Sequence, residues 1–315
     1  MKHLPLLGIF IILKSMNPLH INAQNDISAF CDLKEIGFKY GDLTRDDNKY
    51  SYSIYDLNRG RTGFKENIKH KVSNQSLIPA VVHVSVQQLA SWTSLINKTF
   101  DSRIKPEDHR GIKMSYGLTQ ANKLIIIFQP VLLVKRTNRN ETHYDIKYVN
   151  VQYLQKSDGS FEETDDAQTY TNAYQKNTIF KRKNGSFSDF NDFEFDYDKG
   201  DTKSCIMPLL QIKDMYFANN HNLCNAKDSI TFEAIANNYF RVNRRSIKNY
   251  KVHIVAYISG KISDNTIKTL TTDDYKELGA DFGQMDPPNK DYVDLPDEIH
   301  VYLKEKKRQP INPLH

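Results

Sequence analysis

Residues 78–96 read IPAVVHVSVQQLASWTSLI, and this stretch decides the fold class of the chain. Its first part, Ile78 to Val86, is dense in β-branched residues and predicts a largely buried strand. Ser85 followed by Gln88 is a capping-box pattern, so we expect a helix to start at Ser85 and to end near Lys98. The apolar face of that helix carries Leu89, Trp92, Leu95 and Ile96.

Further strands are expected downstream of this stretch. Gly111 to Tyr116, Lys123 to Lys135 and Tyr144 to Gln155 have the composition of strands. The second of them contains Gln129-Pro130, and proline lacks the N–H that a central strand donates. We therefore expect a bulge or a sheet edge at that point.

The C-terminal part repeats this mixture of strands and helices. Ile206 to Ile212 predicts an edge strand because it contains proline, and Lys251 to Ile258 predicts a buried strand. A helix is expected to begin at Asp228 or Ser229, with one side formed by Ile230, Ala234, Ile235 and Tyr239. Two more helices are expected, one after Thr272 and one from Pro296.

The fold class follows from how the strands are grouped. They come in clusters with short turn signals, such as Asp158-Gly159 and Asn184-Gly185, which favours antiparallel pairing. We predict an α+β fold with a mainly antiparallel sheet, a few packed helices and two similar-sized halves. The expected segments are a signal peptide (1–23), an irregular N-terminal arm (24–70), a first α+β half (71–156), a hairpin-rich insertion or linker (157–204), a second α+β half (205–308) and a tail (309–315).

The composition removes several classes of protein. The 315 residues include 43 Lys and Arg, 38 Asp and Glu, 26% charged residues and 11% aromatics. So much charge argues against a membrane protein with many spans, and so many aromatics argue against a wholly disordered chain.

The N-terminus has the layout of a secretory signal peptide. Lys2 and His3 precede an apolar run from Leu4 to Leu13, and Ala23-Gln24 resembles a cleavage site. This run is shorter than the roughly 20 residues that span a bilayer, so we expect no transmembrane span in the mature chain. Cleavage near Ala23 predicts a periplasmic or extracellular protein. The alternative is a cytosolic protein whose apolar N-terminus packs on its body.

The charge that remains after cleavage is small. The net charge of +5 falls to +3 once Lys2 and Lys14 are removed. So weak a field does not predict nucleic acid as a partner.

Three cysteines bear on the expected compartment. Cys205 and Cys224 lie 19 residues apart, and Cys31 stands alone. In an oxidising compartment the nearer pair is the disulfide candidate, with about 3 kcal/mol of stabilisation on the chain-entropy account. Two other interpretations remain open: a metal site that includes His221, or two buried thiols.

One acid-rich segment of the sequence offers candidate metal ligands. The sequence contains no HExxH, GxSxG, GxGxxG or Walker A motif. The acid-rich run 189–201 reads DFNDFEFDYDKGD, and Asp196, Asp198 and Asp201 are candidate ligands for an irregular calcium site. Their spacing departs from that of an EF-hand loop. A strand with its aromatic side chains inward and its acids in water explains the run equally, and no other cofactor is expected.

Basic and histidine residues offer weaker candidates. Arg241 to Lys251 contains five basic residues, which we interpret as solvated charges or as a surface for an acidic glycan. His83 and His253 each lie inside an apolar strand and are expected to be hydrogen-bonded structural histidines. A paired catalytic role would require neighbouring strands with both rings on one face. Asp108-His109-Arg110 lies in an expected turn and could do acid–base chemistry only beside a cleft.

Two short motifs resemble a loose group of uncharacterised Bacteroidota proteins. The first is the strand and helix of residues 82–98 followed by GIKMSYG (111–117) and LIIIF (124–128), and the second is FGQMDPP (282–288). The resemblance implies the order of these elements. It transfers no activity, cofactor or site residue, because none is established for that group.

These observations lead to a hypothesis and two alternatives for function. We expect an exported, non-enzymatic protein that binds an envelope or surface partner or supports a structure. One alternative is a motif-poor hydrolase, directed at glycans, that uses acids of the 189–201 run. The other is a cytosolic protein with an apolar N-terminus.

Overall fold

The computed structural model of the chain describes residues 27–35, 51–52, 54–138, 141–182, 185–189, 204–220, 224–237 and 251–258, with short strands at 241–242, 245–246, 279–280, 284–286 and 292–293. Helices and strands are mixed throughout these residues, and the strands of the two large sheets pair antiparallel. The predicted α+β class is therefore confirmed.

The helices are dispersed among the strands along the chain. They are α1 (Ser28–Cys31), α3 (Ile54–Asn67), α4 (Val86–Phe100), α5 (Ala167–Asn177) and α6 (Leu209–Asn220), with a 3-10 turn η1 at Asp101–Arg103. None of the helices in the described part of the chain has both the length and the apolar character needed to cross a bilayer.

Within the described residues, two large sheets and two small ones contain the strands. The five-strand sheet has the order β1 (Ser51–Tyr52), β16 (Gly279–Ala280), β15 (Lys251–Ile258), β12 (Ser229–Asn237), β3 (Val81–Ser85). The eight-strand sheet has the order β17 (Gln284–Asp286), β11 (Ser204–Pro208), β4 (His109–Leu118), β5 (Leu124–Asn138), β6 (Glu141–Tyr148), β18 (Tyr292–Val293), with β7 (Tyr153–Gln155) and β8 (Phe161–Glu163) next to β5. The small sheets are β10 (Phe187–Asp189), β9 (Thr178–Lys181), β2 (Ile68–His70) and the pair β13 (Arg241–Val242), β14 (Arg245–Ser246).

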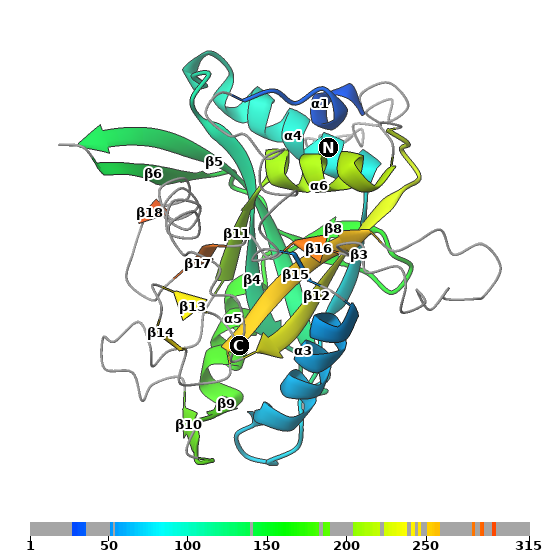
Figure 1. The fold of residues 1–315 in the computed structure, drawn as a ribbon, viewed down its shortest axis with the longest axis vertical. Coiled ribbons are helices and arrows are strands. Elements are labelled where there is room, and N and C mark those ends of the chain that lie inside the picture. The colour runs from blue at the N-terminus through cyan, green and yellow to red at the C-terminus, as the bar shows by residue number, and fades with distance from the viewer. Residues whose placement is uncertain are drawn as a thin grey trace, which may run out of the picture.

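The main core is shared by both large sheets and by helix α4. Phe128 of β5 meets Phe232 of β12 with ring centroids 5.7 Å apart, and Trp92 of α4 stacks on Phe128 at 5.3 Å. Tyr116 of β4 donates its hydroxyl to the carbonyl oxygen of Val252 in β15, at 3.2 Å. Helices α1, α4 and α6 lie together at one end of the molecule, at the top of Figure 1.

Residues 81–100 fold as a strand, β3, followed directly by a helix, α4. In β3, Val82 and Val84 are buried, whereas Val81 and His83 point outward, so the strand is half-exposed rather than largely buried. The amide of Gln88 donates to Ser85 Oγ at 3.0 Å, which confirms the predicted cap of α4. The helix ends at Phe100, two residues beyond the predicted end.

Helix α3 lies within the segment expected to be an irregular arm, and that part of the expectation is wrong. The helix is mostly polar, and it packs on the outer face of β12 through a few residues such as Leu57. Gly60 permits this close approach, because a Cβ at that position would lie 2.6 Å from Ile235 Cδ1. The glycine and the sparse apolar residues concealed the helix in the sequence.

The helix predicted after Asp228 is also wrong, because residues 229–237 form β12. One face of this strand packs in the main core through Ile230, Phe232 and Ala234, and the other face is covered by α3. A strand buried on both faces loses the alternation that identifies strands in a sequence. The prediction of one strand over Ile206 to Ile212 is also wrong, because β11 ends at Pro208 and helix α6 follows directly. Residues 209–212 are all buried, so they show no alternation that could have distinguished the helix from a strand.

Pro130 lies at an interruption of the eight-strand sheet rather than at its edge or at a bulge. On one side Pro130 pairs with Ile112 of β4. On the other side the ladder with β6 stops at Val131 and the contact with β7 is at Phe128, so the missing N–H of Pro130 falls between two partner strands.

The two expected halves are interleaved. Strand β3 of the first expected half pairs with β12 of the second, and β4 of the first pairs with β11 of the second. Hairpin turns occur at Gly159 and Gly185, both with φ near +86°. The segment 1–23 and the helices expected after Thr272 and from Pro296 lie outside the described residues.

Candidate functional site

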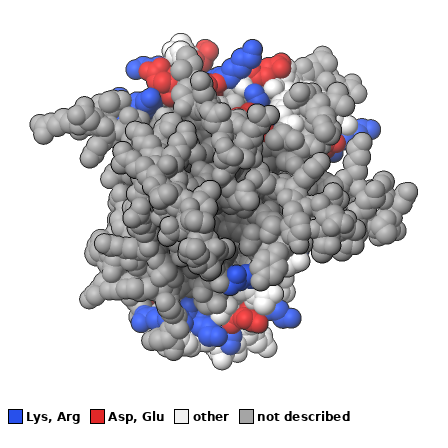
Figure 2. Space-filling view, in the orientation of Figure 1, with Lys and Arg blue, Asp and Glu red and all other residues white. Residues whose placement is uncertain are grey.

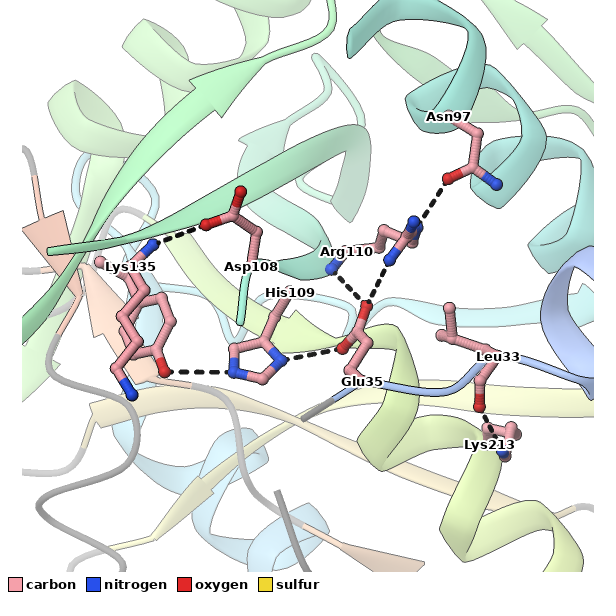
Figure 3. A network of polar contacts seen from close by, with 9 residues as sticks. Leu33, Glu35, Asn97, Asp108, His109, Arg110, Lys135 and Lys213 are labelled. Atoms are coloured by element: carbon pink, nitrogen blue, oxygen red, sulfur yellow. Dashed lines mark hydrogen bonds and ion pairs between the residues drawn. The ribbon is translucent and has the colours of Figure 1, made fainter. Parts of the chain in front are cut away.

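A buried polar network surrounds His109, the first residue of β4 (Figure 3). The Glu35 carboxylate lies between His109 and Arg110: His109 Nδ1 is 2.9 Å from Oε2, and the Arg110 amide donates to Oε1 at 2.8 Å. Arg110 Nη1 is 3.2 Å from the same oxygen. Both the His109 and the Glu35 side chains are only 1% exposed.

Tyr144 of β6 completes the environment of the histidine. Its hydroxyl lies 3.1 Å from His109 Nε2, and the two ring centroids are 5.1 Å apart. Since an ionised carboxylate only accepts hydrogen bonds, Nδ1 is the donor to Glu35, and Nε2 lies within hydrogen-bond distance of the Tyr144 hydroxyl. The histidine is thus held at both nitrogens.

Arg110 connects this network to helix α4. Its Nε donates to Asn97 Oδ1 at 2.6 Å, and Nη1 bonds to Glu35, so two edges of the guanidinium are fixed. Nη2 has no partner among the described residues. The side chain of Arg110 is 17% exposed, so solvent reaches its guanidinium, in contrast to the side chains of His109 and Glu35.

Asp108 is buried and bonds to backbone groups. Its carboxylate accepts from the amide of Lys105 at 2.9 Å and from the amide of Lys135 at 3.0 Å. These bonds close the turn that precedes β4 and tie it to β5. Asp108 therefore has a structural role, while the histidine and arginine beside it carry the polar network.

A disulfide holds the segment that carries Glu35. Cys31 of α1 is bonded to Cys224, with 6.2 Å between their Cα atoms and 193 residues between them in sequence. Lys213 of α6 also donates to the carbonyl oxygen of Leu33, at 2.5 Å. Residues 27–35 are in this way fixed to the body of the molecule at Cys31 and at Leu33.

The predicted disulfide between Cys205 and Cys224 is therefore wrong. Cys205 lies in β11 with its side chain buried in the main core, directly opposite Met114 of β4. Proximity in sequence favours pairing Cys205 with Cys224, but the fold brings α1 against α6 and places Cys31 beside Cys224. A long-range pair of this kind leaves no signal in the spacing of the cysteines.

A second carboxylate lies near this network. Burial raises the pKa of Asp214 in α6, and the negative charge of Glu35 raises it further, while Lys213 opposes the shift. The acid therefore holds its proton to a higher pH than an ordinary aspartate does.

An open hollow adjoins Arg110, and we name it the Arg110 hollow. It has a volume of about 350 Å³ and is lined by Lys34, Asn97, Asp101, Ile104, Lys105, Pro106 and Arg110. Three of these side chains are cationic and one is anionic. Neither Lys34 nor Lys105 forms an ion pair within the described part of the chain, so the hollow has an excess of positive charge.

The two strand histidines do not form a site. His83 of β3 and His253 of β15 lie on opposite sides of β12, where His83 pairs with Thr231 and His253 with Ile235. His83 Nδ1 lies 2.9 Å from the hydroxyl oxygen of Thr231, as expected of a hydrogen-bonded structural histidine. The neighbouring strands required for a paired role are absent from this arrangement.

Other candidate residues lie mostly outside the described part of the chain. Asp196, Asp198 and Asp201, the calcium candidates, are among them, as is His221. Asp189 is described and is paired with Lys71. Among the described residues, no group of three or more His, Cys, Asp or Glu side chains is placed to hold a metal ion.

The sequence does not predict Glu35, Asn97 or Tyr144 as members of this network. Glu35 is the most consequential of the three because it contacts both His109 and Arg110. The sequence offers Asp108-His109-Arg110 as a candidate for acid–base chemistry, but Glu35 lies 73 residues before Asp108, in a segment without a periodic pattern. Its local sequence, DLKEIG, is an ordinary polar stretch. Only the fold, with α1 packed against α4 and α6, brings it to the histidine.

Comparison with known proteins adds no family to this description. No protein-family model matches the chain, and neither a curated protein nor a solved structure matches it significantly.

Proposed function

We propose that this chain is an exported binding protein and that the Arg110 hollow binds a carboxylate group of an acidic ligand. The observation that carries the proposal is the fixed guanidinium of Arg110, which Asn97 and Glu35 orient while Nη2 is left for a ligand. A pre-positioned planar guanidinium suits a carboxylate, because little side-chain entropy is lost on binding.

The other groups at the hollow favour the same kind of ligand. Lys34 and Lys105 add two positive charges, and Asp101 adds one negative charge. The volume of about 350 Å³ is at the lower end of the range for small-ligand sites. An acidic sugar unit of an envelope or surface glycan is a ligand of this size and charge.

The side chains that could transfer a proton, those of His109, Glu35 and Tyr144, are buried, which favours binding over catalysis at this end of the molecule. His109 and Glu35 are 1% exposed and Tyr144 is 2% exposed, whereas a general acid or base must reach the substrate. The lysines and Arg110 are the groups in contact with solvent.

Export is supported by the disulfide and by the sequence. Disulfides persist in oxidising compartments, and the bond between Cys31 and Cys224 closes a loop that spans most of the described chain. The signal-peptide layout of residues 1–23 and the resemblance to Bacteroidota proteins agree with this proposal. N-terminal sequencing of the protein from its native host tests it: a start near Gln24 supports export, and an intact Met1 contradicts it.

Binding is tested by calorimetric titration with trigalacturonate, with neutral maltotriose as the comparison ligand. We expect the wild-type protein to bind trigalacturonate only, and Lys34→Gln/Lys105→Gln to lower the affinity about tenfold, the effect of losing about 1.4 kcal/mol. The matched control is Lys123→Gln/Lys227→Gln, which makes the same change in net charge at exposed positions away from the hollow. Equal weakening by both double variants would contradict the assignment of the site.

A further inference from the structure

A second hollow lies at the opposite end of the molecule, where α3, β2 and β9 meet. It has a volume of about 530 Å³, and we name it the lysine hollow after three of its lining residues, which are Thr62, Lys65, Glu66, Lys69, Ser76 and Lys181. Lys and Arg side chains, with acidic ones between them, gather at the lower end of Figure 2, where Figure 1 places β9, β10 and the end of α3.

The positive charge of the lysine hollow is not neutralised by acidic side chains among the described residues. Its three ammonium groups face one carboxylate, Glu66. Lys65, Lys69 and Lys181 form no ion pair among the described residues, whereas the neighbouring Lys71 is paired with Asp189. Lys69 Nζ instead lies over the ring of Phe187, 4.8 Å from its centroid, which fixes the position of its charge.

The hydrogen-bond donors of this hollow are its ammonium groups. Thr62 Oγ1 already donates to the carbonyl oxygen of Asn58 at 3.1 Å, and Ser76 Oγ donates to the carbonyl oxygen of Lys65 at 2.6 Å. Both hydroxyl hydrogens are therefore in use. A ligand that satisfies the three lysines must bring acceptor atoms and negative charge.

We propose that the lysine hollow binds a phosphate monoester group. Such a group carries close to two negative charges at pH 7 and has three terminal oxygens, which match the net charge of the hollow and its three ammonium donors. Lysines bind phosphate as point charges, without the planar geometry that a guanidinium supplies. The volume leaves room for the sugar or glycerol unit that bears the phosphate.

This site is independent of the Arg110 hollow, and its test uses different residues. The probe is glucose 6-phosphate, with glucose as the uncharged control, and the readout is the acylation rate of each lysine amine, measured by peptide mass spectrometry. At a probe concentration ten times its Kd, we expect acylation of Lys65, Lys69 and Lys181 to slow about tenfold. Lys123 and Lys227 report on reactivity away from the hollow and should not change.

A double variant gives a second readout of the same site. Lys65→Gln/Lys181→Gln leaves Lys69 on its aromatic ring and is expected to lower the affinity for glucose 6-phosphate about tenfold or more. Lys123→Gln/Lys227→Gln is again the matched control and should bind as the wild type does. Lys34→Gln/Lys105→Gln should also bind the probe unchanged, which separates this proposal from the proposed function.

Vesicles distinguish the two sources of a phosphate monoester. Protection of the three lysines by phosphatidic acid vesicles as well as by glucose 6-phosphate supports a lipid headgroup, and protection by the sugar phosphate alone supports a soluble ligand. The proposal would be overturned if neither probe protected the three lysines, or if Lys123 and Lys227 were protected to the same extent. The proposal would also be overturned if, without any probe, Lys65, Lys69 and Lys181 were acylated as slowly as Lys71. Such slow acylation would mean that acidic groups of the chain itself neutralise their charge, as Asp189 does for Lys71.

Discussion

Two buried glutamates, Glu35 and Glu233, are each paired with an arginine, but they are held in different ways. Glu233 lies in the middle of β12 and is bound by Arg61 of α3, with Nε and Nη2 at 2.6 and 2.7 Å from its two oxygens. Tyr257 of β15 donates to Glu233 at 2.8 Å. Glu35 lies on an irregular segment that the disulfide holds in place.

The partners of the two carboxylates also differ in their access to water. The side chain of Arg61 is 44% exposed, whereas His109 is 1% exposed and Arg110 is 17% exposed. Burial raises the pKa of Tyr257, and the charge of Glu233 raises it further, so Tyr257 stays a hydrogen-bond donor. If Glu233 is removed, the exposed guanidinium of Arg61 can be solvated by water, so the loss of folding free energy is small. If Glu35 is removed, the buried groups of His109 and Arg110 that it binds cannot reach water, so the loss is larger.

The largest expected effect separates these two regions directly. Replacing both bonded cysteines, Cys31→Ser/Cys224→Ser, removes a constraint across 193 residues and is expected to cost about 5 kcal/mol on the chain-entropy account. Urea unfolding measures the loss. Hydrogen exchange of backbone amides locates the loss of stability. The Arg110 amide, which donates to Glu35, should exchange faster relative to the amides of β12 in the variant than in the wild type.

Reductant provides the control for this comparison. It should destabilise the wild-type protein and leave the double variant unchanged, since the variant has no bond between Cys31 and Cys224 to break. Peptide mapping that found Cys205 bonded to Cys224, or an unfolding midpoint that did not move, would contradict the arrangement described for α1.

A pair of single variants tests whether access to water decides the cost. Glu35→Ala leaves the Arg110 amide and the His109 Nδ1–H buried without an acceptor, and we expect a loss of about 3 kcal/mol. Glu233→Ala leaves an arginine that can turn into solvent, and we expect about 1 kcal/mol after screening is taken into account. Both are measured as free energies of unfolding in urea. Equal losses would mean that partner exposure does not separate the two sites.

The local sequence pattern predicts several elements correctly, although not always their burial. The strand at residues 81–85, the cap at Ser85, helix α4 and the hairpin turns at Gly159 and Gly185 all follow from near neighbours in sequence. Prediction fails where the local pattern does not report the contacts that an element makes in the fold. Strand β12 is covered by the core and by α3, so it lost its alternation, and α3 is a polar helix whose contact depends on Gly60.

The candidate site was out of reach for a related reason. His109 and Arg110 could be noticed as charged neighbours, but Glu35, Asn97 and Tyr144 come from separate segments that only the tertiary fold unites. The bond between Cys31 and Cys224 has the same character, because its two ends lie 193 residues apart. Long-range pairs of this kind are set by packing and not by local pattern.

The smallest expected effect concerns the pH dependence of the disulfide-held end. Because burial and the charge of Glu35 raise the pKa of Asp214 above its usual 3.8, the folded state binds this proton more tightly than the unfolded state does. The wild-type protein should lose stability relative to Asp214→Asn as the pH rises from about 4 through the folded-state pKa, and the difference should then stay constant. At pH 7 the variant should be more stable by at most about 1 kcal/mol.

Urea unfolding of both proteins between pH 3 and 7 measures this difference, and Asp158→Asn supplies a control of opposite sign. Hydrogen bonds from Ser160 lower the pKa of Asp158, so the wild-type protein should lose stability relative to that variant as the pH falls through the folded-state pKa. If the Asp214→Asn difference kept one value across this range, the carboxyl would not be desolvated. Adding Glu35→Gln should narrow the difference, since it removes the charge that helps to raise the Asp214 pKa. An unchanged difference would mean that burial alone acts on Asp214, and Glu35 would then influence only the histidine and arginine it touches.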